Sequence, residues 1–298
     1  MIQQIARANR RQSAQRVRGA RRGAQQLLPP RRRKGIGRRE DGRAAAVPTA
    51  TQRADASSGE LIEAVFKRNR KRYGYRRIGA ELSDRGVVCA PARIRRIMAQ
   101  RGLRAIQPKT FVPKTSDGRA DQPSPNLLSG RPLPEAPNQV WAGDITFIPT
   151  SLGWLYLAVV IDLCSRRIVG WSLADHLRAE LVVAALEQAL QTRPAKEVIF
   201  HSDRGSQYGS GSFRNTLAKA GLRQSMSARA NPYDNAWSES FIGTLKLEML
   251  QDGCFETAAD ARTEIFDYIE GYYNTHRKHS ALGYQTPSQF ETHLNSAK

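Results

Sequence analysis

The stretch Val198–Met249 decides the fold of this chain. It begins VIFHSDRGSQYGS and, after a helical segment, ends ARANPYDNAWSESFIGTLKLEM. Asp203 follows the apolar run Val198–Phe200, which predicts a buried strand that ends in a glycine-containing loop. Around Glu239 the apolar residues recur every four positions, which predicts a helix with one buried stripe made of Trp237, Phe241, Leu245 and Met249.

The spacing of the charged residues adds a second signal. Between Asp203 and Glu239 lie 35 residues, and Lys246 follows Glu239 by seven, so two helical turns return it to nearly the same face. A third carboxylate, Asp144, lies in the strand-like segment VWAGDITFIP. Three carboxylates carried by strands and a helix can together hold two divalent cations.

These residues resemble a known family. The set Asp144, Asp203 and Glu239, with this spacing and with Lys246, resembles the DDE transposases and the retroviral integrases. Four longer motifs are similar to the catalytic-domain protein of the insertion sequence three family, namely DITFIP, FHSDRGSQY, NPYDNAWSESFIGTLKLE and YNTHRKHSALGYQTPSQF. The resemblance covers residues 61–290. One departure is Gly143, which stands where the family often has Thr or Ala.

The resemblance implies a metal-dependent catalytic site. Asp144 would bridge two Mg²⁺ ions, with Mn²⁺ as a substitute, and Asp203 and Glu239 would each complete the ligands of one ion. Lys246 would hold DNA beside the site. Taken singly, Asp203 is typical of a turn and Glu239 of an exposed helix face, but the spaced trio favours catalysis.

The charge distribution indicates a nucleic-acid partner. The net charge is +20, which favours nucleic acid over acidic small molecules. Residues 1–59 carry 15 Lys and Arg against 3 Asp and Glu, and residues 60–119 carry 16 against 5. The remaining residues carry 16 against 19. The basic charge therefore lies entirely in the first 119 residues.

Residues 1–59 are predicted to be a disordered, Arg-rich segment. They contain no aromatic residue and no helical period, so they cannot bury enough apolar surface to fold. Three interpretations stay open: a solvated tail, an arm that grips DNA, and translation from a displaced start or a shifted frame. No apolar run of about 18 residues exists, so no membrane span is expected.

Residues 60–104 are predicted to form a small all-α helix-turn-helix domain that binds DNA. Three helices of about ten residues, separated by glycine turns, suit that module. The basic residues of its third helix are the candidate DNA contacts: Arg93, Arg95, Arg96 and Arg101. A helical bundle with a solvated charged face is the alternative. Residues 105–138 are rich in proline and predict a basic extended linker.

Residues 139–298 are predicted to form the catalytic domain with a C-terminal helix. Three strands joined by short turns indicate an antiparallel meander, at 140–148, 154–161 and 167–173. Helices and strands then alternate, at 181–190, 197–200, 213–220 and 223–226, before the Glu239 helix and a last helix at 258–273. This order is that of an RNase H-like integrase core, an α/β fold with a mixed five-stranded sheet and flanking helices. In that fold strands one and four are neighbours, which brings Asp144 to Asp203.

Several other polar residues have less specific patterns. Asp162 is predicted to be a turn carboxylate paired with Arg166 or Arg167, with a fourth metal ligand as the alternative. His201 fits either a substrate contact or a packed, hydrogen-bonded imidazole. The polar residues of the C-terminal motif are interpreted as DNA or packing contacts, namely His276, Arg277 and His279.

The resulting hypothesis is a DNA transposase. By resemblance it would bind the terminal inverted repeats of an insertion element, nick them and join the 3′-hydroxyl to target DNA, as a homo-oligomer with a possible upstream-frame partner protein. The three separated cysteines form no CxxC pair, which favours a reducing cytoplasm, where the protein would associate with the nucleoid. The alternatives are a catalytically silent DNA-binding protein derived from a transposase, and a stand-alone nuclease of the same fold.

Overall fold

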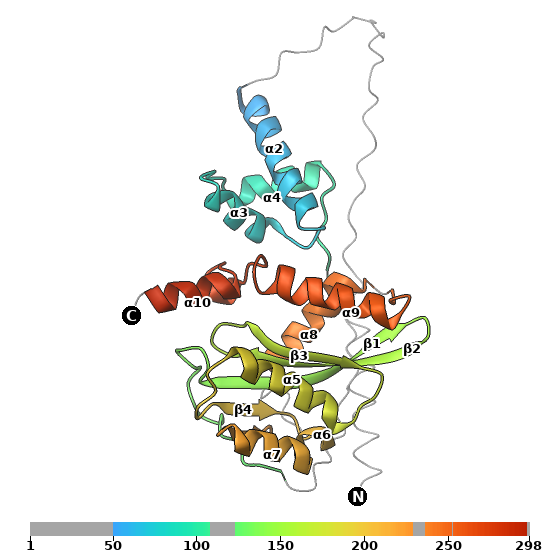
Figure 1. Ribbon diagram of the computed structural model, residues 1–298. Coiled ribbons are helices and arrows are strands. Elements are labelled where there is room, and N and C mark those ends of the chain that lie inside the picture. The colour runs from blue at the N-terminus through green and yellow to red at the C-terminus, as the bar shows by residue number, and fades with distance from the viewer. Residues whose placement is uncertain (1–49, 108–122, 229–235, 252, 297–298) are drawn as a thin grey trace, which may run out of the picture. The chain divides into compact units, whose positions relative to one another are not determined.

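The computed structural model describes residues 50–107, 123–228, 236–251 and 253–296 (Figure 1). A three-helix module comes first, and a sheet with helices on both faces follows. The segment Pro48–Lys298, which contains both, packs as one unit. In the described part of the chain, no helix combines the length and the apolar character needed to cross a bilayer.

Three helices, α2 (Ala50–Arg68), α3 (Tyr75–Asp84) and α4 (Pro91–Gln100), form the first module. Apolar side chains at helical spacing close its interior, and they are Ile62, Val65, Phe66, Tyr73, Ile78, Leu82, Ile94, Ile97 and Met98. Pro91 starts α4, because its fixed φ suits the first helical position, where no N–H is needed. The small all-α module predicted ahead of the sheet is therefore confirmed.

The predicted end of the disordered segment is wrong for residues 50–59, because α2 begins at Ala50. Asp55 in this early part of α2 forms ion pairs of 2.8 Å with both Arg93 and Arg96 of α4. These pairs hold the early turns of α2 beside α4, where composition alone predicts no order. The rest of that segment, residues 1–49, and residues 108–122 of the predicted linker lie outside the described residues.

Five strands form one mixed sheet in the order β3-β2-β1-β4-β5. They are β1 (Val140–Thr150), β2 (Gly153–Asp162), β3 (Ile168–Ala174), β4 (Ile199–Ser202) and β5 (Arg223–Met226). β2 runs antiparallel to both β1 and β3, whereas β4 is parallel to both β1 and β5. The predicted meander and the pairing of the first strand with the fourth are confirmed.

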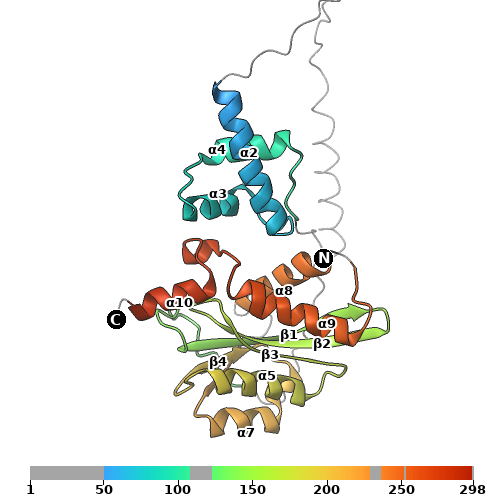
Figure 2. The same ribbon diagram turned by 45° about the horizontal axis from the view of Figure 1, so that its top comes forward.

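Helices cover both faces of this sheet (Figure 2). On one face lie α5 (Ala179–Thr192), α6 (Ser206–Gly209) and α7 (Gly211–Lys219). On the other lie α8 (Ala236–Met249) and α9 (Ala258–Phe266). Successive side chains of β1 alternate between the two apolar cores, as the pleat requires, so that Trp141 joins the α5 side and Ala142 the α8 side.

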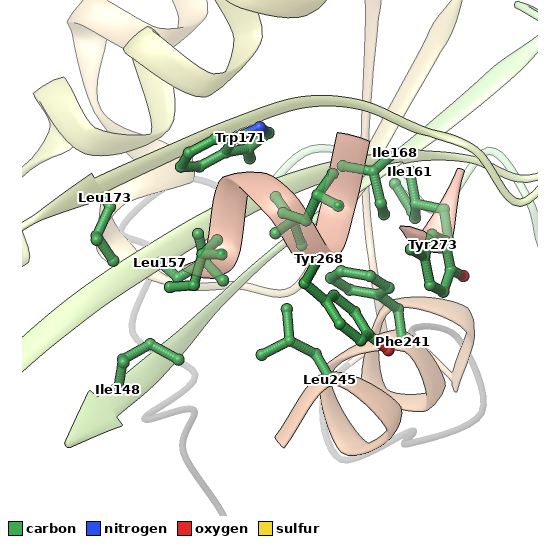
Figure 3. Close-up of a cluster of buried hydrophobic side chains, with 14 of the residues drawn as sticks. Ile148, Leu157, Ile161, Ile168, Trp171, Leu173, Phe241, Leu245, Tyr268 and Tyr273 are labelled. Carbon is green, nitrogen blue, oxygen red and sulfur yellow. The ribbon is translucent and has the colours of Figure 1, made fainter. Parts of the chain in front are cut away.

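The core on the α8 side ties the C-terminal elements to the sheet (Figure 3). Phe241 of α8 packs edge-on against Tyr273, with ring centroids 4.7 Å apart. Tyr273 ends η2 (Asp267–Tyr273), a π-helical continuation of α9, so the long helix predicted at 258–273 changes its winding partway. A short 3₁₀ turn, η3 (Ser280–Leu282), and α10 (Pro287–Ser296) complete the chain's described elements.

The described end of the predicted linker, residues 123–138, lies against the catalytic domain. The N–H of Met226 in β5 donates to the carbonyl of Pro125 at 3.4 Å, and the N–H of Leu127 donates to Ser225 Oγ at 2.9 Å. Leu127 and Leu128 also pack against the α8-side core. This part of the predicted extended linker therefore contains bends and turns and is bound to the edge of the sheet.

Candidate active site

The parallel ladder between β1 and β4 places two aspartates side by side. Gly143 of β1 is paired with Ser202 of β4, and Asp144 and Asp203 are the residues that follow. The register of a buried sheet is set by which positions are apolar, since a slip of one residue would turn every side chain to the other face. The apolar pattern of the strands thus brings these two carboxylates together.

Asp144 lies in an environment that opposes its charge. Its pKa is raised from 3.8 to about 8, first by burial and next by the negative charge of Asp203, with a further contribution from Glu239. The N–H of Ile145 donates to Asp144 Oδ1 at 2.8 Å, and the positive charge of Lys246 also favours the carboxylate. Both effects are smaller than the burial, so the surroundings favour the protonated carboxyl of Asp144 over its carboxylate.

Asp203 is oriented by the short loop that follows β4. Its Oδ1 accepts a hydrogen bond from the N–H of Gly205 at 2.9 Å. A Cβ at position 205 would lie 3.0 Å from this oxygen, so a larger residue would crowd the carboxylate. The intervening Arg204 donates from Nε to the carbonyl of Ser227 at 2.8 Å. The sequence DRG therefore fixes one carboxylate oxygen and secures the loop beside it.

Helix α8 supplies the third carboxylate and the lysine. Phe241 and Leu245 are buried in the core, while Glu239 is exposed and its charge acts on Asp144. Burial lowers the pKa of Lys246, and the charge of Asp144 opposes this shift, so the two groups are within electrostatic reach. Among the residues that the structure describes, no three acidic, His or Cys side chains lie close enough to hold one ion. The charges of Asp203 and Glu239 therefore act on Asp144, but the three described carboxylates are not arranged as ligands of one ion.

Gly143 has a packing reason that the sequence did not reveal. A Cβ at this position would lie 2.6 Å from Cζ of Phe200 and 3.2 Å from Cε1 of Tyr208. Both rings belong to the core on the α5 side, with centroids 6.2 Å apart. Phe200 and Tyr208 therefore occupy the space that a side chain at residue 143 would need, directly before Asp144. We expect any larger residue there to displace an aromatic ring.

Asp162 is a structural carboxylate at the β2–β3 turn. It is fully buried and accepts three backbone N–H bonds of 2.6 to 2.9 Å, from Asn138, Cys164 and Ser165. The predicted pairing with an arginine is wrong, because Arg167 bonds to Glu291 at 3.0 Å and Arg166 lies over the ring of Trp237. Backbone N–H groups at the turn were closer partners than either arginine.

His201 follows the packed interpretation. It is fully buried, and its ring nitrogens lie 2.8 Å from Ser225 Oγ and 3.2 Å from Ser227 Oγ. The imidazole of His201 points toward Ser225 of β5 and toward Ser227, which follows β5. The imidazole therefore ties β4 to this edge of the sheet.

The four predicted DNA-contacting arginines differ in their surroundings. Arg93 and Arg96 pair with Asp55, as described above, and Arg101 pairs with Glu63 of α2 at 2.7 Å. Arg95 is exposed and borders a hollow beside Gly74 and Leu103. A phosphate group would have to share or displace the α2 carboxylates at three of these positions, whereas Arg95 points to solvent.

Sequence reasoning missed a buried charge at the C-terminal end of α8. The predicted stripe runs in steps of four and assigns Trp237 and Met249 to the core, but both are half-buried. A helix repeats every 3.6 residues, so the buried face drifts to Ser238 at one end and Glu248 at the other. A glutamate three positions after the buried Leu245 was the available signal.

Comparison with protein families divides the chain in the same way. An HTH-like domain model matches residues 52–111. Two integrase core domain models match residues 134–232 and 220–287. Together they cover the three-helix module, the sheet and the helices α8 and α9.

Similar proteins include two bacterial transposases. The transposase for insertion sequence element IS904 of Lactococcus lactis subsp. lactis is 44% identical over 233 residues, which cover 78% of this chain and 92% of that protein. The transposase InsF for insertion sequence IS3A of Escherichia coli K12 is 41% identical over 232 residues, which cover 78% of this chain and 81% of that protein.

Two solved structures of viral integrases have more distant similarity. The HTLV-2 integrase catalytic core domain in complex with magnesium is 19% identical and covers 52% of this chain and 97% of that one, with a TM-score of 0.40. The catalytic core domain of BIV integrase is 17% identical and covers 54% and 97%, with a TM-score of 0.41. Similarity at this level does not establish a shared activity.

Proposed function

The chain belongs to the transposase family that includes the proteins of IS904 and IS3, and on that premise we propose that it cuts and joins the ends of a mobile DNA element at one site. Membership makes it a DDE transposase, a polynucleotidyl transferase that acts on DNA. The proposal concerns how the residues of this chain perform that activity, and which DNA they engage.

Asp144, Asp203 and Glu239 are the proposed ligands of two Mg²⁺ ions, for which Mn²⁺ can substitute. The observation that carries this assignment is the parallel pairing of β1 with β4, which sets Asp144 and Asp203 at neighbouring positions. The pKa of Asp144, raised by burial and by the neighbouring carboxylates, is consistent with it. Hard oxygen ligands with excess negative charge suit a divalent cation. When bound, the ions would activate the attacking oxygen and stabilise the charge that develops on the phosphate.

One site serves both reactions because their bond changes are alike. In nicking, a water oxygen attacks a phosphodiester at the element end, one P–O bond forms, another breaks, and a 3′-hydroxyl is released. In joining, that hydroxyl attacks a phosphodiester of the target, and again one P–O bond replaces another. Nicking is a hydrolysis, and joining conserves the number of phosphodiester bonds, so neither reaction needs an external energy source.

The DNA is held by two parts of the chain. Lys246, on the same helix as Glu239, contacts a phosphate near the reacting bond, where a lysine acts as a point charge. The three-helix module reads the terminal repeats through α4, where Arg95 is exposed. Arg93, Arg96 and Arg101 reach phosphates by sharing or displacing their carboxylate partners on α2. Pairing two ends requires an oligomer, and a partner protein from an upstream frame completes the assembly.

A strand-transfer assay with DNA that flanks the coding region tests this proposal. The purified protein and Mg²⁺ should nick that DNA at the element ends and join it to a plasmid, while scrambled ends stay intact. Binding to the ends without nicking, in Mg²⁺ and in Mn²⁺, would instead support a silent DNA-binding protein. Cleavage without end preference or joining would support a nuclease.

A further inference from the structure

The C-terminal end of α8 is held by a buried ion pair. Glu248 and Arg277 are each 5% exposed. Arg277 donates from Nε at 3.1 Å and from Nη2 at 2.9 Å to the carboxylate, and the Tyr268 hydroxyl donates to Glu248 Oε2 at 2.9 Å. A guanidinium that donates two hydrogen bonds to one carboxylate fixes the orientation of both groups as well as their distance. The end of the helix that carries Glu239 therefore has a defined position.

The turn between α2 and α3 reaches the same end of α8. Arg72 donates from Nη2 to the backbone carbonyl of Glu248 at 3.3 Å. Its guanidinium lies over the rings of Tyr272 and Tyr268, 4.4 and 5.2 Å from their centroids. The last carbonyls of a helix lack internal partners and carry partial negative charge, so a cation suits them. Arg72 thus caps the catalytic helix from within the three-helix module.

Tyr73 joins the module to the segment that carries Arg277. Its side chain is fully buried. The hydroxyl donates to the carbonyl of His276 at 3.0 Å and accepts from the N–H of Lys278 at 2.9 Å. The ammonium of Lys278 in turn pairs with Asp84, the last residue of α3. The residues on both sides of Arg277 are therefore fixed by the module.

We propose that Arg72 is a positioning residue for Glu239, which acts through the Glu248 end of α8 and couples the three-helix module to the catalytic site. A movement of the module shifts Arg72 and Tyr73, and through them the Glu248–Arg277 pair. Because α8 spans only 14 residues, its two ends move together. DNA bound to the module then biases where Glu239 lies relative to Asp144. This inference rests on the proposed role of Glu239 as a metal ligand.

The test compares two arginines of one module. Arg72→Ala removes the cap, whereas Arg85→Ala removes an exposed arginine that directly follows α3 and pairs with Glu81 of that helix. Both variants lose one positive charge. We expect Arg72→Ala to raise the Mg²⁺ concentration for half-maximal nicking by about fivefold or more. Arg85→Ala should leave it unchanged, and end affinity and the melting temperature should match the wild type in both.

A second variant keeps the test decisive if Arg72→Ala lowers the melting temperature. Tyr73→Phe retains the buried ring and removes only the two hydrogen bonds to residues 276 and 278. It should raise the Mg²⁺ requirement in the same direction, and Arg72→Lys should recover part of the loss. An unchanged Mg²⁺ requirement in both Arg72→Ala and Tyr73→Phe would overturn the inference.

The Glu239→Gln variant separates this inference from the proposed function. If Glu239→Gln nicks normally, the assignment of Glu239 fails and the coupling loses its target. If Glu239→Gln is inactive while Arg72→Ala and Tyr73→Phe keep the wild-type Mg²⁺ requirement, the proposed function stands and only the coupling fails.

Discussion

Two acidic residues, the buried Glu248 and the half-buried Asp144, have opposite surroundings. Glu248 is bound by Arg277 and by the hydroxyl of Tyr268. Asp144 has two other carboxylates as neighbours, and its pKa rises to about 8 because of burial and of Asp203. Glu248 is paired with a cation within the chain, whereas Asp144 is the carboxylate that we propose to bridge the metal ions.

The difference separates a carboxylate that holds two elements of the fold together from one that we propose to bind metal. A buried ion pair with complete hydrogen bonding keeps its ionised form and fixes the elements that carry it. A cluster of carboxylates whose charges are only partly compensated lowers the stability of the fold, and such clusters occur where a cation or a substrate is bound. The charges of their neighbours distinguish Glu248 from Asp144 more sharply than their burial does.

The largest expected effect is on the free energy of unfolding when the buried pair of Glu248 and Arg277 is broken. Arg277→Ala leaves Glu248 buried without its cation, so we expect the free energy of unfolding to fall by about 3–5 kcal/mol. Urea unfolding followed by circular dichroism measures it. Arg178→Ala is the matched control, because Arg178 forms an exposed pair with Glu180, and its effect should stay within about 0.5 kcal/mol. Equal losses in the two variants would contradict the structural role of the buried pair.

Removing the charge of Asp144 should have the opposite effect and stabilise the metal-free protein as the pH rises. Its pKa in the folded protein lies above its ordinary 3.8, near 8, so the folded state binds the proton more tightly than the unfolded state. This contribution to stability is complete below pH 4 and is lost as the pH rises through about 8. Without metal, the wild type should therefore lose melting temperature over this range relative to Asp144→Asn.

Added Mg²⁺ sharpens that comparison. It should restore the melting temperature of the wild type at pH 8 and leave Asp144→Asn nearly unchanged, because the variant lacks the carboxylate proposed to bridge the ions. Parallel pH profiles for the two proteins in EDTA would show that Asp144 carries no unbalanced charge.

An intermediate effect is expected at Asp162, a buried carboxylate balanced by backbone N–H groups. Asp162→Asn replaces one acceptor oxygen by an amide, so at least one buried N–H loses its partner, at a cost of about 1–3 kcal/mol. Nicking should fall only in proportion to the folded fraction. Complete loss of nicking in a folded Asp162→Asn protein would instead make this residue a fourth metal ligand.

The smallest effect concerns Lys246 and is a change of slope. Lys246→Ala should make the salt dependence of DNA affinity shallower by about one unit of log–log slope, since one phosphate contact is lost. Fluorescence anisotropy at several salt concentrations measures it. A slope equal to that of the wild type, together with reduced turnover, would place Lys246 in the chemistry itself.

The sheet and its two aspartates were predictable because their signals are local. Short apolar runs mark β1 and β4. Asp144 lies within β1, and Asp203 directly follows β4. The parallel pairing that joins them follows from the order of elements in an RNase H-like fold. Asp144 and Asp203 could therefore be brought together before any coordinates were known.

The remaining features depend on contacts between distant residues. The early part of α2 is held by Asp55, whose partners lie 38 and 41 positions along the chain, at Arg93 and Arg96. Arg277, which donates to the carboxylate of Glu248, lies 29 positions away from it in the sequence. Arg72, which donates to the backbone carbonyl of Glu248, lies 176 positions away. In addition, the apolar residues of α8 recur every four positions, and this spacing does not reveal that the buried face shifts around the helix toward Ser238 and Glu248. Of these features, only the buried Glu248 had a signal in the local sequence, because a glutamate stands there within an apolar stripe.

The central claim is that Asp144, Asp203 and Glu239 act together, and one parallel measurement tests it. Nicking and joining products are quantified for Asp144→Asn, Asp203→Asn and Glu239→Gln, and gel-shift affinity for the element ends is measured in the same preparations. Each substitution keeps the shape of the side chain and removes one proposed metal-binding charge. We predict wild-type end affinity with no nicked or joined product in all three. Normal turnover in any one of them would contradict the account.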